Sequence, residues 1–227
     1  MDNVVRLENI TKSFTEGENS RKVIDNLSFD IKKGEILVLY GRSGSGKSSL
    51  LNLIAGLDNP DSGKIFINGT DITGLNETDK TVFRRKHIGF VFQFFNLIPT
   101  LTVFENLLLP LELNKTLSAE KKEQALSLLE ETGLHNRKNS FPDVLSGGEQ
   151  QRIAVLRALL TDPDILLADE PTGNLDFRTA KIVIDMIDRL VLGKKKTLIM
   201  ATHSRELTGI ATRIFSFRDG KLEKAEL

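Results

Sequence analysis

The sequence predicts an α/β fold in which a mainly parallel β-sheet is covered by helices on both faces. Three apolar runs, Ile36–Tyr40, Ile165–Ala168 and Thr197–Met200, do not alternate with polar residues. Strands of this kind are typical of parallel sheets that are buried on both faces. Longer segments with helical spacing separate the runs, and this alternation of strand and helix indicates an α/β architecture.

The remaining elements follow from the spacing of apolar and β-branched residues. Further strands are expected at Val4–Leu7, Leu27–Ile31, Lys64–Ile67, Ile88–Phe92 and Arg213–Phe217. Helices are expected at Lys47–Leu57, Thr102–Leu109, Ser118–Thr132, Gly148–Leu160 and Asp176–Leu192. The helices between Phe94 and Leu160 have no strand among them, which indicates an all-helical insertion. Asp219-Gly220 lies between two short runs and predicts a terminal hairpin turn.

Length and composition favour one large domain without disulfides. The chain has 227 residues, no Cys, and 31 Lys and Arg against 31 Asp and Glu. At roughly 150 residues per domain, this length predicts one domain that carries an inserted part. A chain of this size buries enough surface to fold without disulfides or a structural metal. The lack of Cys is compatible with a reducing compartment, so we expect a cytoplasmic protein.

Charge and hydropathy argue against several classes of protein. A formal net charge of zero disfavours a nucleic-acid-binding protein, whose domain is usually basic. The opening residues MDNVVRLENI lack the regions of a secretory signal peptide. The most apolar segment, 88–113, is interrupted by polar residues and falls short of the roughly 18 apolar residues of a membrane span. We therefore expect another chain to supply any transmembrane path.

A glycine-rich segment predicts a phosphate-binding loop. Residues 41–49 read GRSGSGKSS and fit the pattern G-x-x-x-x-G-K-[ST]. The segment follows a buried strand and opens a helix, so backbone N–H groups and the positive helix end converge on the phosphates. Lys47 offers a positive charge and Ser48 a hydroxyl for Mg²⁺. The alternative is a Gly-rich turn, which would need neither side chain.

Two carboxylates follow the strand in the segment ILLADE, residues 165–170. Pro171 cannot continue a central strand, so both carboxylates lie at the carboxyl edge, where open α/β sheets bind ligands. Asp169 is placed to hold Mg²⁺ and Glu170 to polarise an attacking water. The alternative is an acidic loop before the next helix. His203 follows another buried strand, and we expect its imidazole at this edge, near a γ-phosphate.

A second anion-binding segment is LSGGEQQ, residues 145–151. Ser146 and Glu149 have the spacing of a helix capping box, and Gly147-Gly148 expose backbone N–H groups. The alternative is a well-capped helix without a ligand. The chain then has two phosphate-binding segments but one set of Lys, Asp and Glu. The second segment is therefore expected to complete the site of a partner copy.

Taken together, the motifs resemble the nucleotide-binding subunit of an ATP-binding cassette (ABC) transporter, over almost the whole chain. In that family GRSGSGKSS is the Walker A motif, Gln93 the Q-loop, LSGGEQ the signature, ILLADE the Walker B motif with the base, 174–176 the D-loop and His203 the H-loop. The resemblance implies a P-loop NTPase core at 1–93 and 161–227. It also implies an N-terminal antiparallel β subdomain and a helical signature subdomain at 94–160, within a single domain.

The resemblance also implies ligands, partners and roles. The expected reaction is Mg²⁺-dependent hydrolysis of ATP to ADP and phosphate, in a homodimer that holds two ATP between Walker A of one copy and the signature of the other. A separate permease would hold the chain at the cytoplasmic face of the bacterial inner membrane. Expected nucleotide-binding residues are Phe14, Gly41, Arg42, Ser43, Gly44, Ser45, Gly46, Lys47, Ser48, Ser49, Gln93, Ser146, Gly147, Gly148, Glu149 and Asp176. The expected catalytic residues are Lys47, Glu170 and His203, and the expected metal-site residues are Ser48, Gln93 and Asp169.

The segments GFVFQFFNLIPTLTVFENLLLPLEL and LLADEPTGNLD resemble one branch of the family. That branch serves lipoprotein release (LolD-type), macrolide or peptide export (MacB-type) and cell division (FtsE-type). The alternative is an ABC ATPase of a signalling complex that controls cell-wall enzymes and moves no solute. Chromosome-maintenance ATPases carry long coiled-coil insertions, and the interval from Gln93 to Leu145 is too short for one.

Three features depart from the pattern or leave it open. Phe14 stands where the family usually has the Tyr that stacks on adenine, and the alternative is a buried strand-end Phe. Tyr40 occupies a position that is more often aliphatic. Apolar residues after Gln93 form either a groove for a partner helix or the core of the helical insertion; they are Phe94, Phe95, Leu97, Ile98, Leu101, Val103 and Phe104. His87 and His135 lie in no motif and are expected in loops or at strand edges.

Overall fold

The computed structural model describes residues 3–17, 19–192, 196–204, 206–218 and 220–225. A central six-stranded sheet has the order β10-β9-β3-β8-β7-β6, and only the β9–β10 pair is antiparallel. Its strands are β3 (Ile36–Tyr40), β6 (Ile88–Val91), β7 (Ile165–Asp169), β8 (Thr197–Thr202), β9 (Arg213–Arg218) and β10 (Lys221–Lys224). The predicted, mainly parallel sheet is confirmed.

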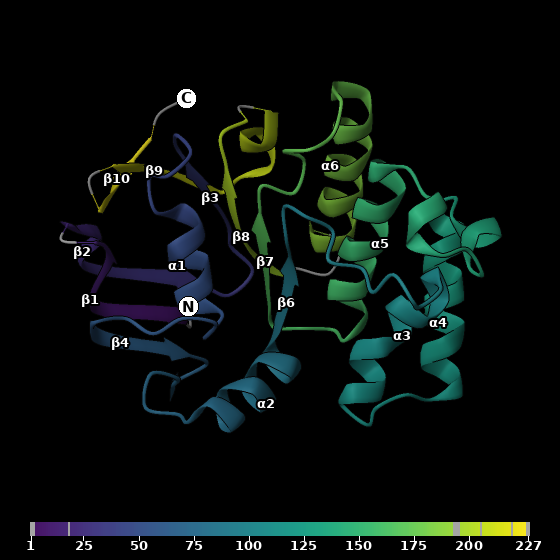
Figure 1. The fold of residues 1–227 in the computed structure, drawn as a ribbon, viewed down its shortest axis with the longest axis horizontal. Helices are drawn as coiled ribbons and strands as arrows, with labels where there is room; N and C mark the ends of the chain where they lie inside the picture. The colour runs from purple at the N-terminus through teal and green to yellow at the C-terminus, as the bar shows by residue number, and fades with distance from the viewer. Residues whose placement is uncertain (1–2, 18, 193–195, 205, 219, 226–227) are drawn as a thin grey trace.

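A second, four-stranded antiparallel sheet has the order β2-β1-β4-β5, and in Figure 1 it lies below β9 and β10 and to the left of β8, β7 and β6. Its strands are β1 (Asn3–Glu16), β2 (Asn19–Lys32), β4 (Ser62–Ile67) and β5 (Thr70–Asp71). β1 and β2 are much longer than the predicted runs. Irregular pairing explains the difference: Asn9 and Asn26 adopt left-handed φ angles of 51° and 48°, so the alternation of polar and apolar residues breaks within the strands.

The hydrophobic core lies on both faces of the central sheet. On β3, Ile36 and Val38 pack toward one cluster, and Leu37 and Leu39 toward the other. The first cluster joins the sheet to α3 (Val103–Leu113), α4 (Ala119–Glu131), α5 (Gly147–Leu160) and α6 (Phe177–Leu192). The second joins it to α1 (Lys47–Ile54) and the antiparallel sheet. This two-sided burial is the physical basis of the non-alternating runs.

The described chain between β6 and β7 contains helices and no strand, as predicted. Besides α3, α4 and α5 it has short 3₁₀ turns at His135–Arg137 and Pro142–Val144. Helix α3 continues past the predicted end at Leu109 and contains Pro110. Proline costs stability inside a helix. Here the next turn buries Leu111, which is 1 % exposed, and this packing favours the longer helix.

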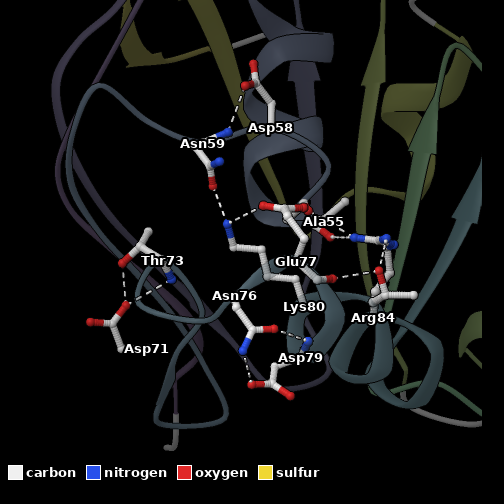
Figure 2. Close-up of polar contacts among 12 residues, drawn as sticks. Ala55, Asp58, Asn59, Asp71, Thr73, Asn76, Glu77, Asp79, Lys80 and Arg84 are labelled. Carbon is white, nitrogen blue, oxygen red and sulfur yellow. Dashed lines mark hydrogen bonds and ion pairs between the residues drawn. The ribbon is translucent and has the colours of Figure 1, made fainter.

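Helix α2 (Glu77–His87) is absent from the sequence-based expectations because it has no apolar stripe. Polar contacts hold it instead (Figure 2). Asn76 caps its first turn by accepting the Asp79 N–H at 2.9 Å. The buried Lys80 ammonium donates to Asn59 Oδ1 and to Glu77 Oε1. His87, expected in a loop or at a strand edge, is instead the last residue of α2, directly before the edge strand β6.

Smaller differences concern helix and chain ends. Helix α1 ends at Ile54 rather than at Leu57, because Gly56 turns the chain with a φ of 62°. His135 lies in a 3₁₀ turn, near Glu130. The hairpin of β9 and β10 is confirmed by the pairing of Arg218 with Lys221, while Asp219 of its turn lies outside the described residues. Across the described ranges, none of the helices has the length and apolar character needed to cross a membrane.

Candidate nucleotide site

The loop between β3 and α1 requires glycine where it meets the helix. Gly46 precedes α1 with a φ of 111°. A Cβ atom there would lie 2.7 Å from Val23 Cγ1 and 2.8 Å from the Phe217 ring. The first turn of α1 has no side-chain cap, so its N–H groups are open to an anion. This is the local geometry of a phosphate-binding loop.

Lys47 lies at the centre of this loop and is only 4 % exposed. Its Nζ donates to Gly41 O at 2.7 Å and to Arg42 O at 3.0 Å, and it lies 3.8 Å from Glu170 Oε1. Burial lowers the pKa of Lys47, and the carboxylates of Glu170 and Asp169 oppose this effect. The neighbouring carboxylates therefore help to keep a buried ammonium charged.

Ser48 and Asp169 come together although they are 121 residues apart, and the Ser48 hydroxyl donates to Asp169 Oδ1 at 2.9 Å. Burial raises the pKa of Asp169, with a further contribution from Glu170, while the hydrogen bond from Ser48 and the charge of Lys47 act in the opposite direction. A hydroxyl and a carboxylate are the hard oxygen donors that Mg²⁺ takes beside phosphate and water. The residues present fit a Mg²⁺ site.

Glu170 directly follows β7 in a strained conformation. Its φ is 43°, in the left-handed region that non-glycine residues seldom adopt. Its backbone N–H donates to Ala201 O at 2.9 Å. The carboxylate turns toward His203, whose Nδ1 lies 2.9 Å from Oε2 and whose backbone N–H donates to Oε2 at 3.3 Å. The expected edge position of His203 is confirmed, and its imidazole contacts Glu170.

A pocket of about 500 Å³ opens beside these residues. It is lined by Phe14, Arg21, Val23, Ser43, Gly44, Ser45, Gly46, Lys47, Ser48, Ser49, Gln93 and Glu170. Phe14 is 44 % exposed, which rules out the buried alternative. The Lys12 ammonium lies 5.3 Å from the centre of the Phe14 ring. A second hollow of about 1090 Å³ adjoins the pocket and is lined in part by Tyr40 and His203, but nothing in the structure explains an aromatic residue at position 40.

Two pocket residues on β2, Arg21 and Val23, belong to no sequence motif. Arg21 Nη2 donates to Gly44 O at 3.1 Å and so holds the glycine-rich loop from outside. Val23 Cγ1 occupies the space that a side chain at position 46 would need. Both belong to the part of β2 that the sequence did not predict as strand, and no local signal points to them.

The signature residues do not line this pocket in their own chain. Ser146 begins α5 with the predicted capping box: it accepts the Glu149 N–H, and Glu149 Oε2 accepts the Ser146 N–H at 2.8 Å. Burial acts to raise the pKa of Glu149, but hydrogen bonds from Ser146 and the nearby Arg137 bring it below its ordinary value. Asp176 accepts the Thr179 N–H at 3.1 Å at the start of α6. These carboxylates therefore act within the chain as helix caps.

The apolar residues after Gln93 divide between the two alternatives. Val103 is fully buried, and Leu97 and Phe104 pack against the first core cluster. Phe94 and Ile98 remain 69 % and 38 % exposed. Three of the seven side chains thus join the core, two stay on the surface, and Phe95 and Leu101 are half-buried outside the two core clusters.

The parallel sheet, the phosphate-binding loop and the carboxylates at the adjacent strand end define a P-loop nucleotide hydrolase. The sequence profile of the ABC transporter family matches residues 24–173. The chain belongs to this family, as an ATP-binding and ATP-hydrolysing subunit of a transporter.

Its relatives span nearly the same length. An uncharacterized ABC transporter ATP-binding protein of Mycobacterium tuberculosis is 51 % identical, over 96 % of this chain and 88 % of the relative. YtrE of Bacillus subtilis is 43 % identical over 97 % of each chain. The lipoprotein-releasing system protein LolD of Psychrobacter arcticus is 41 % identical over 98 % of this chain and 99 % of its own. The ATP-binding cassette MJ0796, solved as a dimer with ADP and Pi, superposes with a TM-score of 0.90 at 39 % identity, covering 98 % and 97 % of the two chains.

Proposed function

We propose that the pocket binds Mg²⁺–ATP and that Glu170 is the catalytic base. The observation that carries this proposal is that Lys47, Ser48 and Glu170 line one pocket. Asp169 accepts a hydrogen bond from Ser48, and His203 contacts Glu170 from the adjoining hollow. The loop amides and Lys47 bind the phosphates, and Phe14 offers a ring face to adenine. Glu170 accepts the proton of the attacking water, and His203 holds the carboxylate in place.

Ser48, Asp169 and Gln93 are the residues that would hold Mg²⁺. An ion held there would supply positive charge against the negative charge that develops on the phosphates during transfer. The protein's own contribution is positioning and charge stabilisation, because phosphoryl transfer needs little covalent chemistry from it.

We further propose that a second copy completes the site. Ser146, Gly147, Gly148 and Glu149 lie at the start of α5, outside the pocket of their own chain, so an anion bound there belongs to a partner's nucleotide. Asp176 lies at the start of α6 and joins the same interface. The dimeric form of the cassette MJ0796 supports this arrangement.

The finer biological assignment also belongs to this proposal. The chain acts at the cytoplasmic face of the bacterial inner membrane, on a separate permease of the lipoprotein-release and export branch, as the relative named LolD suggests. The exposed Phe94 and Ile98 next to Gln93 offer the permease an apolar contact. Residues 94–160 act as the signature subdomain of a single domain whose core is 1–93 and 161–227.

Complementation between two inactive variants tests the shared site. Glu170→Gln should bind ATP and form a stable dimer without turnover, and Ser146→Arg should spare ATP binding by the monomer. Each variant alone should be inactive, but a mixture forms heterodimers with one intact site, so activity should reappear. The matched control is Ser118→Arg, which removes the similar cap of α4 and should stay active. Activity that never returns on mixing would contradict the partner arrangement, and full turnover by Glu170→Gln would remove Glu170 as the base.

Affinity purification of the chain from membranes tests the partner. We expect a permease with few transmembrane helices and a large extracytoplasmic domain. Recovery of a permease with many helices would overturn the branch assignment. A cell-wall enzyme regulator without transport activity would instead favour the signalling alternative.

A further inference from the structure

We propose that Arg157 is a positioning residue for hydrolysis, which holds the Gln93 segment onto the signature helix α5. Its Nη1 donates to Asn96 O at 2.7 Å and its Nη2 to Phe95 O at 3.1 Å. Two nitrogens of one guanidinium thus hold two successive carbonyls that lie two and three residues after Gln93. This inference rests on the proposed role of Gln93 at the nucleotide.

The chemistry of this contact favours arginine. Burial lowers the pKa of Arg157, and no carboxylate in the described part of the chain lies within ion-pair distance of it. Arg157 is half-buried, and withdrawing a cation from water without a counterion is costly, so the two carbonyls supply its compensation. Arginine is planar and presents several donors in a fixed fork, whereas lysine is a flexible point charge. Lysine keeps the charge but has a single nitrogen, so it cannot give each carbonyl a donor nitrogen of its own in the fixed geometry of the guanidinium.

The backbone between Gln93 and Asn96 is held at further points. Asn96 has a left-handed φ of 49°, which marks a sharp turn three residues after Gln93. The Phe95 ring packs on Gly147 of the signature, since a Cβ added there would lie 3.3 Å from Phe95 Cζ. Asn174 Nδ2 donates to Gln93 O at 3.1 Å. The position of Gln93 in the pocket is thus tied to α5 and to the D-loop segment.

The contacts of Arg157 connect the two nucleotide sites of the proposed dimer. When a partner's nucleotide binds at the start of α5, any shift of that helix passes through Arg157 to the backbone beside Gln93. The contact therefore links the signature, which acts on the partner's site, to the pocket of its own chain. A purely structural arginine would stabilise the fold without affecting Gln93.

A matched arginine exists elsewhere in the chain. Arg84 on α2 donates to Gly56 O at 3.0 Å and to Ala55 O at 3.4 Å, as Figure 2 shows for Ala55. Its Nη1 reaches both successive carbonyls, while its Nη2 donates to Thr81 Oγ1 at 3.2 Å. Neither Arg84 nor those carbonyl residues line the nucleotide pocket. Arg84→Lys thus controls for the replacement of a partly buried arginine that donates to backbone carbonyls away from the pocket.

The test is a double-mutant cycle on steady-state ATPase activity. We expect Arg157→Lys to lower kcat by about tenfold or more with little change in KM for ATP, because small misplacement of a positioning group is costly. Arg84→Lys should change kcat by less than about twofold, because Arg84 does not line the nucleotide pocket and its replacement affects mainly the stability of the fold. Gln93→Ala combined with Arg157→Lys should be no less active than Gln93→Ala alone. Independent, multiplicative losses in kcat, or a wild-type kcat for Arg157→Lys, would overturn the proposal.

A structural reporter separates misplacement from misfolding. The chain contains no Trp, so Phe94→Trp places a single fluorophore beside Gln93. In this background Arg157→Lys should lower the fluorescence anisotropy and raise acrylamide quenching, while circular dichroism stays unchanged; Arg84→Lys should alter neither signal. Unchanged fluorescence in Arg157→Lys would count against the proposal. Full activity of Gln93→Ala would instead remove the proposed role of Gln93 itself.

Discussion

The Nδ1 atom of His203 lies 2.9 Å from Oε2 of Glu170, so the residue after β8 holds the carboxylate that follows the neighbouring strand β7. The two residues are 33 positions apart in the sequence, and the backbone N–H of His203 adds a second contact to the same oxygen. The carboxylate also lies close to Lys47. The proposed base is thus oriented on one side by an imidazole and on the other by an ammonium.

His203→Ala should lower kcat by about a hundredfold while ATP still binds, because a misdirected base loses much of a general-base contribution of about 10²–10⁴. The backbone contact to Glu170 remains in this variant, so some activity should persist. The measurements are steady-state kinetics and equilibrium ATP binding. His135→Ala is the control, since His135 makes a similar contact with Glu130 at 3.1 Å outside the site. Equal effects of the two variants would refute the assigned role of His203.

Gly46→Ala should destabilise the protein more than Gly44→Ala does. Both glycines have positive φ angles, 111° and 73°, so each substitution adds backbone strain. A Cβ at Gly44 meets nothing within 4 Å, whereas one at Gly46 meets Val23 and Phe217 below 3 Å. We expect a loss of about 1 kcal/mol at Gly44 and about 1–3 kcal/mol more at Gly46. Urea unfolding of both variants measures the difference, and equal losses would contradict the crowding argument.

Gly148→Ala should destabilise the start of α5, and Thr179→Ser should rescue it. A Cβ at Gly148 would lie 2.0 Å from Thr179 Cγ2 on α6. Overpacking of this kind costs about 1–3 kcal/mol, part of which the better helix propensity of Ala offsets. Serine lacks the Cγ2 methyl, and its backbone N–H can still donate to the Asp176 carboxylate that caps α6.

The check is the melting temperature of the single and double variants. Gly147→Ala serves as the milder comparison, because its nearest contact is the Phe95 ring at 3.3 Å. If Thr179→Ser gave no recovery in the double variant, the close approach of α5 and α6 at this point would not be the cause.

Asp169→Asn should stabilise the protein at neutral pH in the absence of ATP and Mg²⁺. Burial raises the pKa of Asp169 in the folded chain above the ordinary 3.8. At a pH between 3.8 and the raised pKa, the folded chain therefore binds more protons than the unfolded chain. The free energy of unfolding therefore falls as the pH rises from about 3.8 through the raised pKa. Asparagine removes this penalty and can still accept the Ser48 hydrogen bond.

Melting temperatures from about pH 4 to about pH 8 test the sign of this effect. The advantage of Asp169→Asn should be largest at neutral pH and should shrink toward acid pH. Addition of ATP and Mg²⁺ should raise the melting temperature of the wild type more than that of the variant. A variant that is less stable than the wild type at neutral pH would show that burial does not dominate at Asp169.

Several features of the fold and site were readable from local patterns. The strand at Ile36–Tyr40 has the predicted bounds, and the capping box of Ser146 and Glu149 forms as its spacing indicates. Such features depend on residues within one turn or one strand, so short windows contain the relevant interactions. The sequence pattern did not predict helix α2, because one of its main buried contacts joins residues that are far apart in the sequence. Its buried group is the ammonium of Lys80, whose partner Asn59 lies 21 residues away.

The sequence by itself determined the fold class, the phosphate-binding loop, the carboxylate pair and the family, because apolar periodicity and compact motifs are local properties. Only the tertiary structure decided which atoms meet. It placed Ser48 against Asp169, turned His203 onto Glu170, and brought Arg157 to the carbonyl of Asn96, 61 residues away. These contacts depend on how helices and strands pack around the two-sided core. No spacing along the chain records that packing, so the functional geometry emerges only when the whole fold is formed.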